Sequence, residues 1–332
     1  MNVTRAVPAK AEAAVARAAV LAEPGRIELR SVARPAPGPG QVVVRLEGCG
    51  VCASNLAPWA GQPWFEYPFE PGSPGHEGWG VVESVGPGVT GVAPGDRVAT
   101  LGDRAYASHQ VVSGDEVVPL PPELDGRPFP GEPLGCAMNI FDRARIRAGD
   151  RVAVVGVGFL GALVTQLAVA GGARVVGISR REYSRAVARG AGADRVLATD
   201  DEDAAVAAVE EWTGGALCDV VVEATGKGAP LRLAARLTRV RGRLVIAGYH
   251  QDGPREVNMQ LWNWRGLDVI NAHERDPARY LDGMRAAIRA TVEGRMDPDP
   301  LITHTFPLED LDRALNRTRD RPDGFLRAVV RP

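Results

Sequence analysis

The chain has 332 residues, with 39 basic and 41 acidic side chains and a formal net charge of −2. So balanced a charge gives no electrostatic basis for binding nucleic acid or an anionic membrane surface. No apolar run reaches the length needed to cross a bilayer, and the alanine-rich start over residues 1–21 carries charges through its middle, where a signal peptide is apolar. We therefore expect a soluble cytoplasmic protein without nucleic-acid or membrane partners, and its length favours two domains.

Residues 18–148 are rich in glycine and proline and contain several short valine-rich runs. Examples of these runs are residues 41–46, 80–85 and 96–100. Short strands divided by turn residues predict a small, mostly antiparallel β domain. The 17 residues before this domain are expected to form a flexible extension.

Candidate metal ligands lie in three separate parts of this first domain. Cys52 follows one valine-rich run, His76 and Glu77 precede another, and Glu132 and Cys136 lie farther along the chain. Thiolate, imidazole and carboxylate groups are the ligands of catalytic zinc, which keeps one position open for water or substrate. Each group taken singly has an ordinary structural interpretation, so the prediction depends on their occurring together. Four cysteines in so long a chain do not make a disulfide framework, and we expect free thiols.

Residues 149–294 alternate apolar, strand-like runs with helical segments. The predicted strands are 152–155, 174–178, 195–198, 219–223, 243–247 and 267–271, and the helices between them include 203–212 and 230–238. This alternation predicts an α/β fold with a doubly wound parallel sheet. A helical stretch near residues 279–294 follows. Residues 295–332 return to short strands and a short helix, and they are expected to rejoin the first domain.

The first of these strands runs directly into a Gly-x-Gly-x-x-Gly motif. Gly156 permits a tight turn, Gly158 lets the backbone approach a pyrophosphate, and Gly161 allows a helix to pack closely on the strand. The phosphates would then lie at the N-terminus of that helix, which favours negative charge. The predicted cofactor-binding residues are Gly156, Gly158, Phe159, Leu160, Gly161 and Thr225.

The second predicted strand ends in Ser179-Arg180-Arg181-Glu182. An acidic residue at this place accepts a hydrogen bond from the ribose 2′-OH of NAD, whereas a small hydroxyl followed by a guanidinium suits a 2′-phosphate. We therefore favour NADP(H), bound through Ser179 and Arg180. Two alternatives stay open: Glu182 could be the displaced acid of an NAD(H) site, or both arginines could be solvated residues that open a helix.

Together these motifs resemble the medium-chain dehydrogenase/reductase superfamily, specifically its zinc-dependent alcohol and polyol dehydrogenases. The resemblance extends over about residues 18–332 and implies a GroES-like catalytic domain, a Rossmann domain, and hydride transfer in the cleft between them. The segments that carry it, in the family's order, are residues 50–54, 75–78, 85–89, 94–98, 132–134, 149–152 and 156–161.

By this resemblance, Cys52 and His76 are the first two protein ligands of a catalytic zinc, with Glu77 beside them as an alternative ligand. Relatives carry Cys, Glu or Asp as the third ligand, at a place that Glu132 matches. We favour Glu132 because it begins a Glu-Pro-Leu run like that of sorbitol-type dehydrogenases. Cys136 falls four residues later and remains the alternative.

The chain also departs from the family pattern. Many relatives carry a four-cysteine lobe for a structural zinc, but no cysteine lies between residues 98 and 112, so we expect one zinc per chain. Asn55 replaces the family's aspartate, and Ala57 stands where a histidine often completes the proton relay. Ser54 matches the residue that accepts the substrate hydroxyl proton.

The resemblance implies an NAD(P)-dependent oxidoreductase that interconverts a secondary alcohol, with polyols and sugar derivatives as candidates, and its ketone. Relatives are usually dimers or tetramers, so we expect a homo-oligomer. One alternative is a metal-free enone or quinone reductase of the same superfamily, and another is a non-catalytic NADPH-binding protein. Candidate pocket residues are Trp59, Trp64 and Phe65, which could instead belong to the core. His250, Gln251 and His273 could bind the substrate or the nicotinamide amide, or could equally hold loops in place or form a subunit contact.

Overall fold

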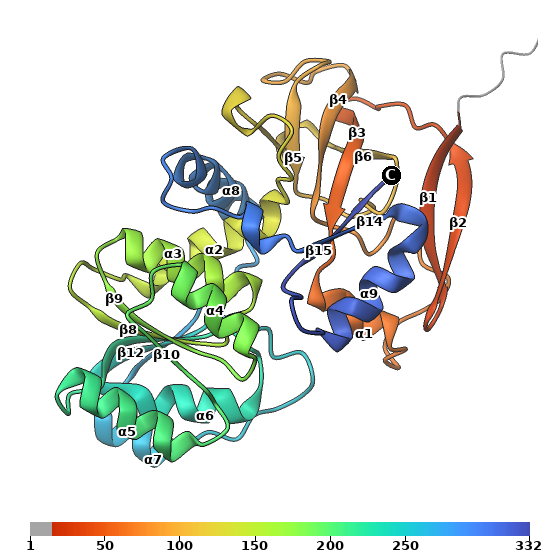
Figure 1. Ribbon diagram of the computed structural model, residues 1–332. Helices are drawn as coiled ribbons and strands as arrows, with labels where there is room; N and C mark the ends of the chain where they lie inside the picture. The colour runs from red at the N-terminus through yellow and green to blue at the C-terminus, as the bar shows by residue number, and fades with distance from the viewer. Residues whose placement is uncertain (1–14) are drawn as a thin grey trace, which may run out of the picture.

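The computed structural model describes residues 15–332, which form two lobes (Figure 1). Most of the predicted N-terminal extension, residues 1–14, lies outside the described residues. Residues 15–17 were assigned to that extension wrongly, because they begin strand β1 (Val15–Glu23). There Ala16 is buried, and the backbone N–H of Arg17 donates to the Ser108 hydroxyl at 2.9 Å.

The middle of the chain forms a six-stranded parallel sheet with the order β10-β9-β8-β11-β12-β13. Its strands are β8 (Arg151–Val155), β9 (Arg174–Ile178), β10 (Arg195–Leu197), β11 (Cys218–Glu223), β12 (Thr238–Ile246) and β13 (Asp268–Asn271). The strand order changes direction between β8 and β11, the kind of crevice where α/β proteins bind nucleotides. The predicted doubly wound fold is therefore confirmed.

Helices cover both faces of this sheet (Figure 1). They are α2 (Gly131–Ala144), α3 (Phe159–Ala170), α4 (Glu182–Gly190), α5 (Glu202–Thr213), α6 (Gly228–Leu237), α7 (Met259–Arg265) and α8 (Pro277–Val292). Successive residues of a strand point to opposite faces. Accordingly, Val152 and Val154 of β8 belong to the core beneath α2, α3 and α8, while Ala153 and Val155 belong to the core beneath α5 and α6. Burial on both faces explains the continuous apolar run in the sequence.

The other lobe is built from the two ends of the chain. Its seven-stranded sheet has the order β14-β15-β3-β4-β5-β7, with β6 also paired to β3. The strands are β3 (Gln41–Gly50), β4 (Gly78–Val85), β5 (Arg97–Thr100), β6 (His109–Ser113), β7 (Val117–Pro119), β14 (His304–Pro307) and β15 (Ala328–Arg331). β15 pairs antiparallel with β3, so the last strand of the chain lies against the strand that leads to Cys52.

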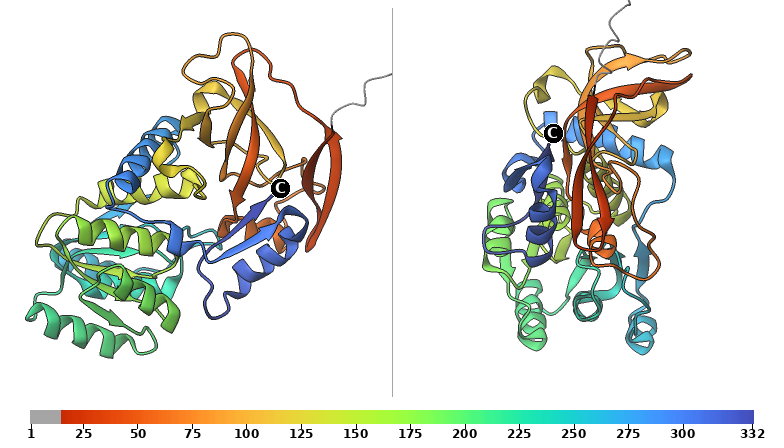
Figure 2. Two further views of the ribbon diagram at one scale, coloured as in Figure 1. Left: turned by 45° about the horizontal axis from the view of Figure 1, so that its top comes forward. Right: turned by 90° about the vertical axis from the view of Figure 1, so that its right-hand side faces the viewer.

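The remaining elements surround this sheet. β1 pairs with β2 (Arg26–Ala33) as a separate hairpin on the outer side of the lobe (Figure 2). The helices are the short α1 (Leu56–Trp59) and α9 (Leu311–Asp320), which contact each other. The 3-10 helices are η1 (Ala53–Asn55), η2 (Gly114–Glu116), η3 (Pro122–Leu124), η4 (Asp299–Leu301) and η5 (Leu308–Asp310).

Helix α2 was not predicted, because its first turns contain Gly131, Pro133 and Gly135 and suggest a loop. Proline is tolerated in the first turn, where the backbone N–H groups have no helical partner. The glycines are required by packing rather than by turns. A Cβ on Gly135 would lie 2.8 Å from the backbone nitrogen of Met284, so only glycine lets α2 and α8 approach this closely.

Candidate active site

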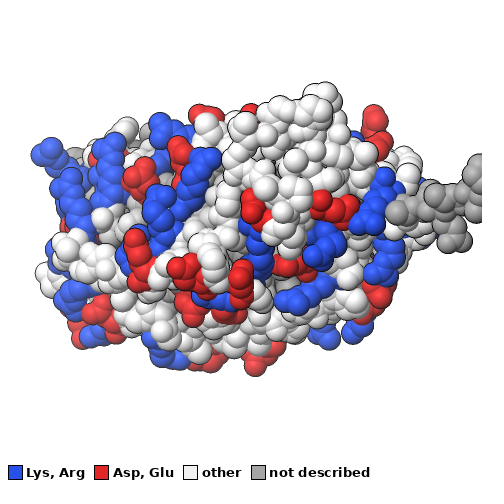
Figure 3. Space-filling view, turned by 90° about the horizontal axis from the view of Figure 1, so that it is seen from above, with Lys and Arg blue, Asp and Glu red and all other residues white. Residues whose placement is uncertain are grey.

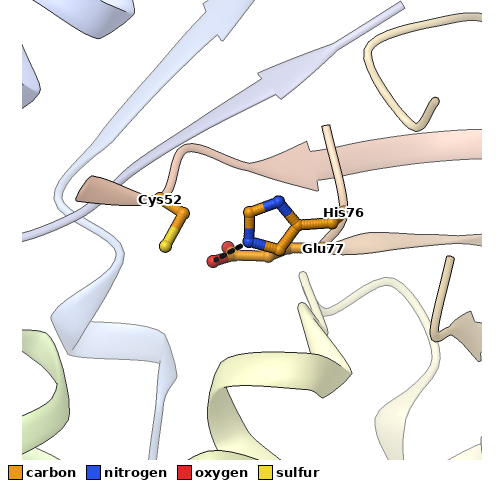
Figure 4. Close-up of side chains that lie close together, drawn as sticks. All are labelled: Cys52, His76 and Glu77. Atoms are coloured by element: carbon orange, nitrogen blue, oxygen red, sulfur yellow. Dashed lines mark ion pairs between the residues drawn. The ribbon is translucent and has the colours of Figure 1, made fainter. Parts of the chain in front are cut away.

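Two segments of the lobe built from the two ends of the chain meet beside the cleft between the lobes. Cys52 follows β3, and His76 and Glu77 directly precede β4. Because β3 and β4 pair antiparallel, with Cys49 opposite Gly78, the end of one strand lies beside the start of the other. The ligand atoms of Cys52, His76 and Glu77 consequently lie within 4.8 Å of one another (Figure 4).

The His76 ring is oriented by its own turn. Its Nδ1 lies 2.9 Å from the Pro74 carbonyl oxygen, which can only accept a hydrogen bond, so Nδ1 carries the proton. The other ring nitrogen, Nε2, is left as a lone-pair donor and lies 4.0 Å from Oε1 of Glu77. This is the arrangement in which a histidine can bind a metal through Nε2 while a carbonyl fixes its tautomer.

The Pro74 carbonyl also explains Asn55, the replacement for the family's aspartate. The Asn55 amide donates to that carbonyl at 3.1 Å, and its own oxygen accepts from the Tyr106 hydroxyl at 2.7 Å. An aspartate here would place a carboxylate against the Pro74 carbonyl oxygen with no proton between them. The asparagine thus completes a neutral, buried network behind His76.

Glu77 is fully buried and forms an ion pair through Oε2 with the guanidinium of Arg327. Its second oxygen, Oε1, is buried and has no hydrogen-bond partner among the described residues. Arg327 directly precedes β15. Its Cζ lies 4.9 Å from the ring centroid of Phe159 in the other lobe. A cation–π contact therefore links the metal-ligand cluster to the start of α3.

Charges in the metal-free cluster are coupled. Burial opposes ionisation of the Cys52 thiol, but the hydrogen bond and charge of His76 outweigh it and hold the pKa of Cys52 below its usual value. The same contact raises the pKa of His76 in spite of its burial. The surroundings of Cys52 therefore favour its thiolate, which is the form of cysteine that binds metals.

Glu132 lies in the first turn of α2, on the opposite wall of the same cleft. It is outside the group of three ligands within 4.8 Å. Burial raises the pKa of its carboxyl to about 7 against the opposing charge of His76. Cys136, one helical turn later, donates its S–H to Oε1 of Glu132 at 3.3 Å, and burial raises the pKa of Cys136. The Cys136 thiol therefore contacts Glu132, and it is not part of the group formed by Cys52, His76 and Glu77.

Ser54 lies on η1 and lines the cleft, and its hydroxyl contributes to lowering the pKa of the Cys52 thiol. Ala57 and Gln62 line the same wall. The cleft encloses about 1830 Å³ and is lined by both lobes, a volume sufficient for a dinucleotide and a small substrate together.

The glycine-rich turn lies on the floor of this cleft. Gly156 has φ of +99°, and a Cβ on it would lie 2.3 Å from the Thr225 methyl carbon. A Cβ on Gly161 would lie 2.1 Å from the Gly156 oxygen, whereas nothing lies within 4 Å of a Cβ on Gly158. The three glycines thus have the turn, exposure and packing functions that the motif predicts. Phe159 and Leu160 begin α3 and line the cleft.

The end of β9 carries the side chains expected to distinguish the cofactors. Ser179 and Arg180 line the cleft, joined there by Arg321 at the end of α9. Burial and the charge of Arg180 both lower the pKa of Arg321, so two guanidinium groups face one region. Glu182 instead forms ion pairs with Arg185 and Arg189. Arg181 donates to the Phe325 carbonyl at 2.6 Å and joins the lobes.

The aromatic residues predicted near the substrate have different surroundings. Trp64 lines the cleft and is 61% exposed. Trp59 is buried in the lobe's core and donates to Asn316 at 3.2 Å, and Phe65 packs near Phe69 with 6.0 Å between the ring centroids. Of these three predicted residues only Trp64 lines the cavity.

Polar residues after β12 and β13 were also predicted near the substrate. Gln251 and His273 line the cleft, and His273 stacks on Tyr249 with 5.4 Å between the ring centroids. His250 does not line the cavity and binds Glu223, at 3.0 Å between Nε2 and Oε2.

Three functional neighbours were missed from the sequence. Arg327 interrupts the apolar run Phe325-Leu326-Arg327-Ala328-Val329, and a charge inside a predicted strand was the available signal. Tyr106 donates to Asn55, and Tyr280 lines the cleft. Neither tyrosine gave a comparable signal in the sequence. Their positions depend on loop paths that residue spacing does not encode.

Basic side chains lie on both sides of the face shown in Figure 3, and acidic side chains lie among them. That face offers no continuous basic surface of the kind that nucleic acid requires. Among the helices of residues 15–332, none combines the length and the apolar character of a membrane span.

The parallel sheet with its glycine-rich turn, facing a Cys–His–Glu cluster across a cleft, defines a two-lobed dehydrogenase. Two family models agree with this class: "Alcohol dehydrogenase GroES-like domain" matches residues 38–125, and "Zinc-binding dehydrogenase" matches residues 160–287. The chain belongs to the medium-chain dehydrogenase/reductase superfamily, as its motifs indicated. It is an oxidoreductase of the NAD(P)-dependent alcohol dehydrogenase type.

Individual relatives are similar over most of their length. Sorbitol dehydrogenase of Gallus gallus is 29% identical over 339 residues, covering 91% of this chain and 93% of that protein. (R,R)-butanediol dehydrogenase of Bacillus subtilis is also 29% identical, covering 86% and 90%. A zinc-binding dehydrogenase structure from Sinorhizobium meliloti, bound to NADP, has a TM-score of 0.84 at 25% identity and covers 96% and 100%.

Proposed function

We propose that this protein is a zinc-dependent oxidoreductase that interconverts a secondary alcohol and its ketone and prefers NADP(H). The observation that carries the proposal is the cluster of Cys52, His76 and Glu77 on the wall of the cleft that the Gly156–Gly161 turn also lines. A metal-ligand set and a dinucleotide-binding turn in one cleft are the two requirements of such a reaction.

The residues present fit a zinc ion. The buried Oε1 of Glu77 has no partner among the described residues, although an unpaired buried oxygen is costly. A thiolate, an imidazole Nε2 and carboxylates form the donor set of catalytic zinc sites. Cys52 and His76 would hold the ion, with Glu132 as third ligand and Glu77 beside them. Zinc bound there supplies a Lewis acid for the substrate oxygen.

Ser54 is the group that would accept the substrate hydroxyl proton, because it lies on the cleft wall beside Cys52. The proton would then leave through the cofactor ribose and water, since Ala57 supplies no histidine to carry it. Arg327 holds Glu77 in place and does not exchange protons at neutral pH.

The substrate class is inferred from polar residues that line the cleft. Gln62, Glu274 and Arg275 line it together with the exposed ring of Trp64. Hydrogen-bonding groups beside one aromatic ring suit a polyol or a sugar derivative. The similarity to a sorbitol dehydrogenase and a butanediol dehydrogenase supports this class. The homo-oligomer implied by the family resemblance stays a prediction, which sedimentation velocity would check.

Replacing Glu132 by alanine should lower the zinc content of the purified chain from near one ion to a small fraction, because it removes the third ligand. Elemental analysis after dialysis against trace zinc would measure this. Cys136→Ser is the matched control, one helical turn away, and should retain the ion. Zinc retained in Glu132→Ala but lost in Cys136→Ser would assign the third ligand to the cysteine instead.

Replacing Arg180 by alanine should lower the preference for NADPH over NADH, as the ratio of kcat/KM values, by about tenfold or more, since it removes a charged hydrogen bond to the 2′-phosphate. Steady-state kinetics with both cofactors would measure the ratio. Arg189→Ala is the control, because Arg189 is outside the cleft lining and pairs with Glu182. A parent enzyme that prefers NADH would contradict the assignment.

A further inference from the structure

Two loops that line the cleft are joined by a row of charged and polar side chains behind them. Glu223 ends β11, His250 follows β12, and Arg255 lies five residues beyond. Glu223 is fully buried, and the side chains of His250 and Arg255 are 16% and 19% exposed. None of the three lines the cavity itself.

Glu223 uses both carboxylate oxygens. Oε1 accepts from the backbone N–H groups of Thr225 and Gly226, at 2.6 and 2.9 Å, and from the Thr225 hydroxyl. Oε2 lies 3.0 Å from Nε2 of His250. One buried carboxylate therefore holds the loop after β11 and reaches the loop after β12.

The direction of the hydrogen bonds fixes the state of His250. Arg255 Nε–H can only donate, and it lies 2.9 Å from Nδ1 of His250. Nδ1 must therefore accept, so the proton is on Nε2 and is donated to Glu223. Arg255 also donates to the Gly226 carbonyl at 3.1 Å and pairs with Asp252, which in turn pairs with Lys227.

The row of bonds reaches the cofactor-binding turn through Thr225. The Thr225 hydroxyl is committed to Glu223 and to the Lys227 N–H, while its methyl group packs where a Cβ of Gly156 would lie. The two loops also touch through their backbones, since a Cβ on Gly248 would lie 2.0 Å from the Gly226 nitrogen. A displacement of either loop would consequently move the wall of the cleft and the turn at Gly156.

We propose that Glu223, His250 and Arg255 form a clasp of positioning residues, which sets the Gly156 turn and the loop after β12 at the spacing that the dinucleotide requires. The inference depends on the proposed function only in requiring a nicotinamide dinucleotide in the cleft. It assigns His250 a role behind the wall of the cleft rather than in contact with substrate.

Binding of NADPH and NADH, measured by fluorescence titration of the zinc-loaded protein, would test the clasp. His250→Leu removes both hydrogen bonds of the ring and should raise the Kd of the preferred cofactor about tenfold. His250→Gln keeps one donor and one acceptor, and it should remain within about threefold of the parent. The matched control is His109→Leu, because His109 makes a similar pair with Glu83, at 3.1 Å, outside the cleft lining.

A parent that binds neither cofactor would refute the proposed function. A parent that binds, with His250→Leu binding equally well, would refute the clasp alone. Equal losses in the Leu and Gln variants would also overturn it, because a clasp requires the bonds and not the imidazole itself. Should His250→Leu fail to fold, Arg255→Met removes the donor to Nδ1 of His250 and retains the buried Glu223–His250 pair. A raised Kd in Arg255→Met would support the clasp, and an unchanged Kd would refute it.

Discussion

Cys52→Ala should lose the zinc ion proposed above and lower kcat/KM by about a thousandfold or more. Zinc contributes several kcal/mol of charge stabilisation at the substrate oxygen, and about 4 kcal/mol corresponds to a thousandfold in rate. The thiolate of Cys52 is one of three ligand atoms grouped within 4.8 Å, and the alanine leaves too few ligands to hold the ion. Elemental analysis and steady-state kinetics on an alcohol and ketone panel would measure both effects.

Cys49→Ala is the matched control for this experiment, because Cys49 lies three residues earlier in the same Cys-x-x-Cys. Its thiol is buried in β3, donates to the Gly50 carbonyl at 3.3 Å, and has its pKa raised by burial. We expect this variant to keep its zinc and most of its activity. A parent without zinc, active on enones or quinones and indifferent to Cys52→Ala, would instead favour the metal-free reductase.

Arg327→Met should lower the free energy of unfolding of the metal-free protein by about 3–5 kcal/mol, because it leaves the Glu77 carboxylate buried without its partner. For a chain of this length, that loss corresponds to a decrease of roughly 4–7 °C in Tm, which differential scanning calorimetry in the presence of chelator would measure. The double variant Arg327→Met with Glu77→Gln should recover part of the decrease, since it removes the unpaired charge as well.

Arg285→Met provides the comparison for an exposed ion pair, because Arg285 pairs with Asp282 at 3.1 Å on the surface of α8. Exposed pairs contribute about 0–1 kcal/mol, so its Tm should change by about 1.5 °C or less. A similar Tm for Arg327→Met and Arg285→Met would show that the buried Glu77–Arg327 pair contributes no more to stability than an exposed ion pair.

The parallel-sheet lobe could be predicted in detail from the sequence. Its strands are buried on both faces, so each appears as an apolar run, and β9 has the bounds that were predicted for it. β12 was the exception, since the prediction began at Arg243 and the strand begins at Thr238. Arg239 is half-buried, and Val240 and Arg241 are exposed. These three residues lie where the pairing with β11 shifts register, between Thr238 and Arg243, so no apolar pattern reveals them.

The grouping of Cys52, His76 and Glu77 could be predicted because these residues lie at strand ends, where local motifs hold them. Cys52, His76 and Glu77 come together through the pairing of β3 with β4. The partners that determine their charge and orientation come from distant sequence: Arg327 is 250 residues from Glu77, and Tyr106 is 51 residues from Asn55. Contacts between such distant residues depend on the folded path of the chain, which residue spacing alone does not determine.

The pairing of β15 with β3 has a consequence for the order of events during synthesis. The strand that leads to Cys52 is made early, but its neighbour in the sheet and the guanidinium that neutralises Glu77 come from residues 327–331. The parallel-sheet lobe, whose strands all come from residues 151–271, has its full set of strands before then. During synthesis, the strands of the parallel sheet are therefore all made before the sheet that leads to Cys52 receives its last strand.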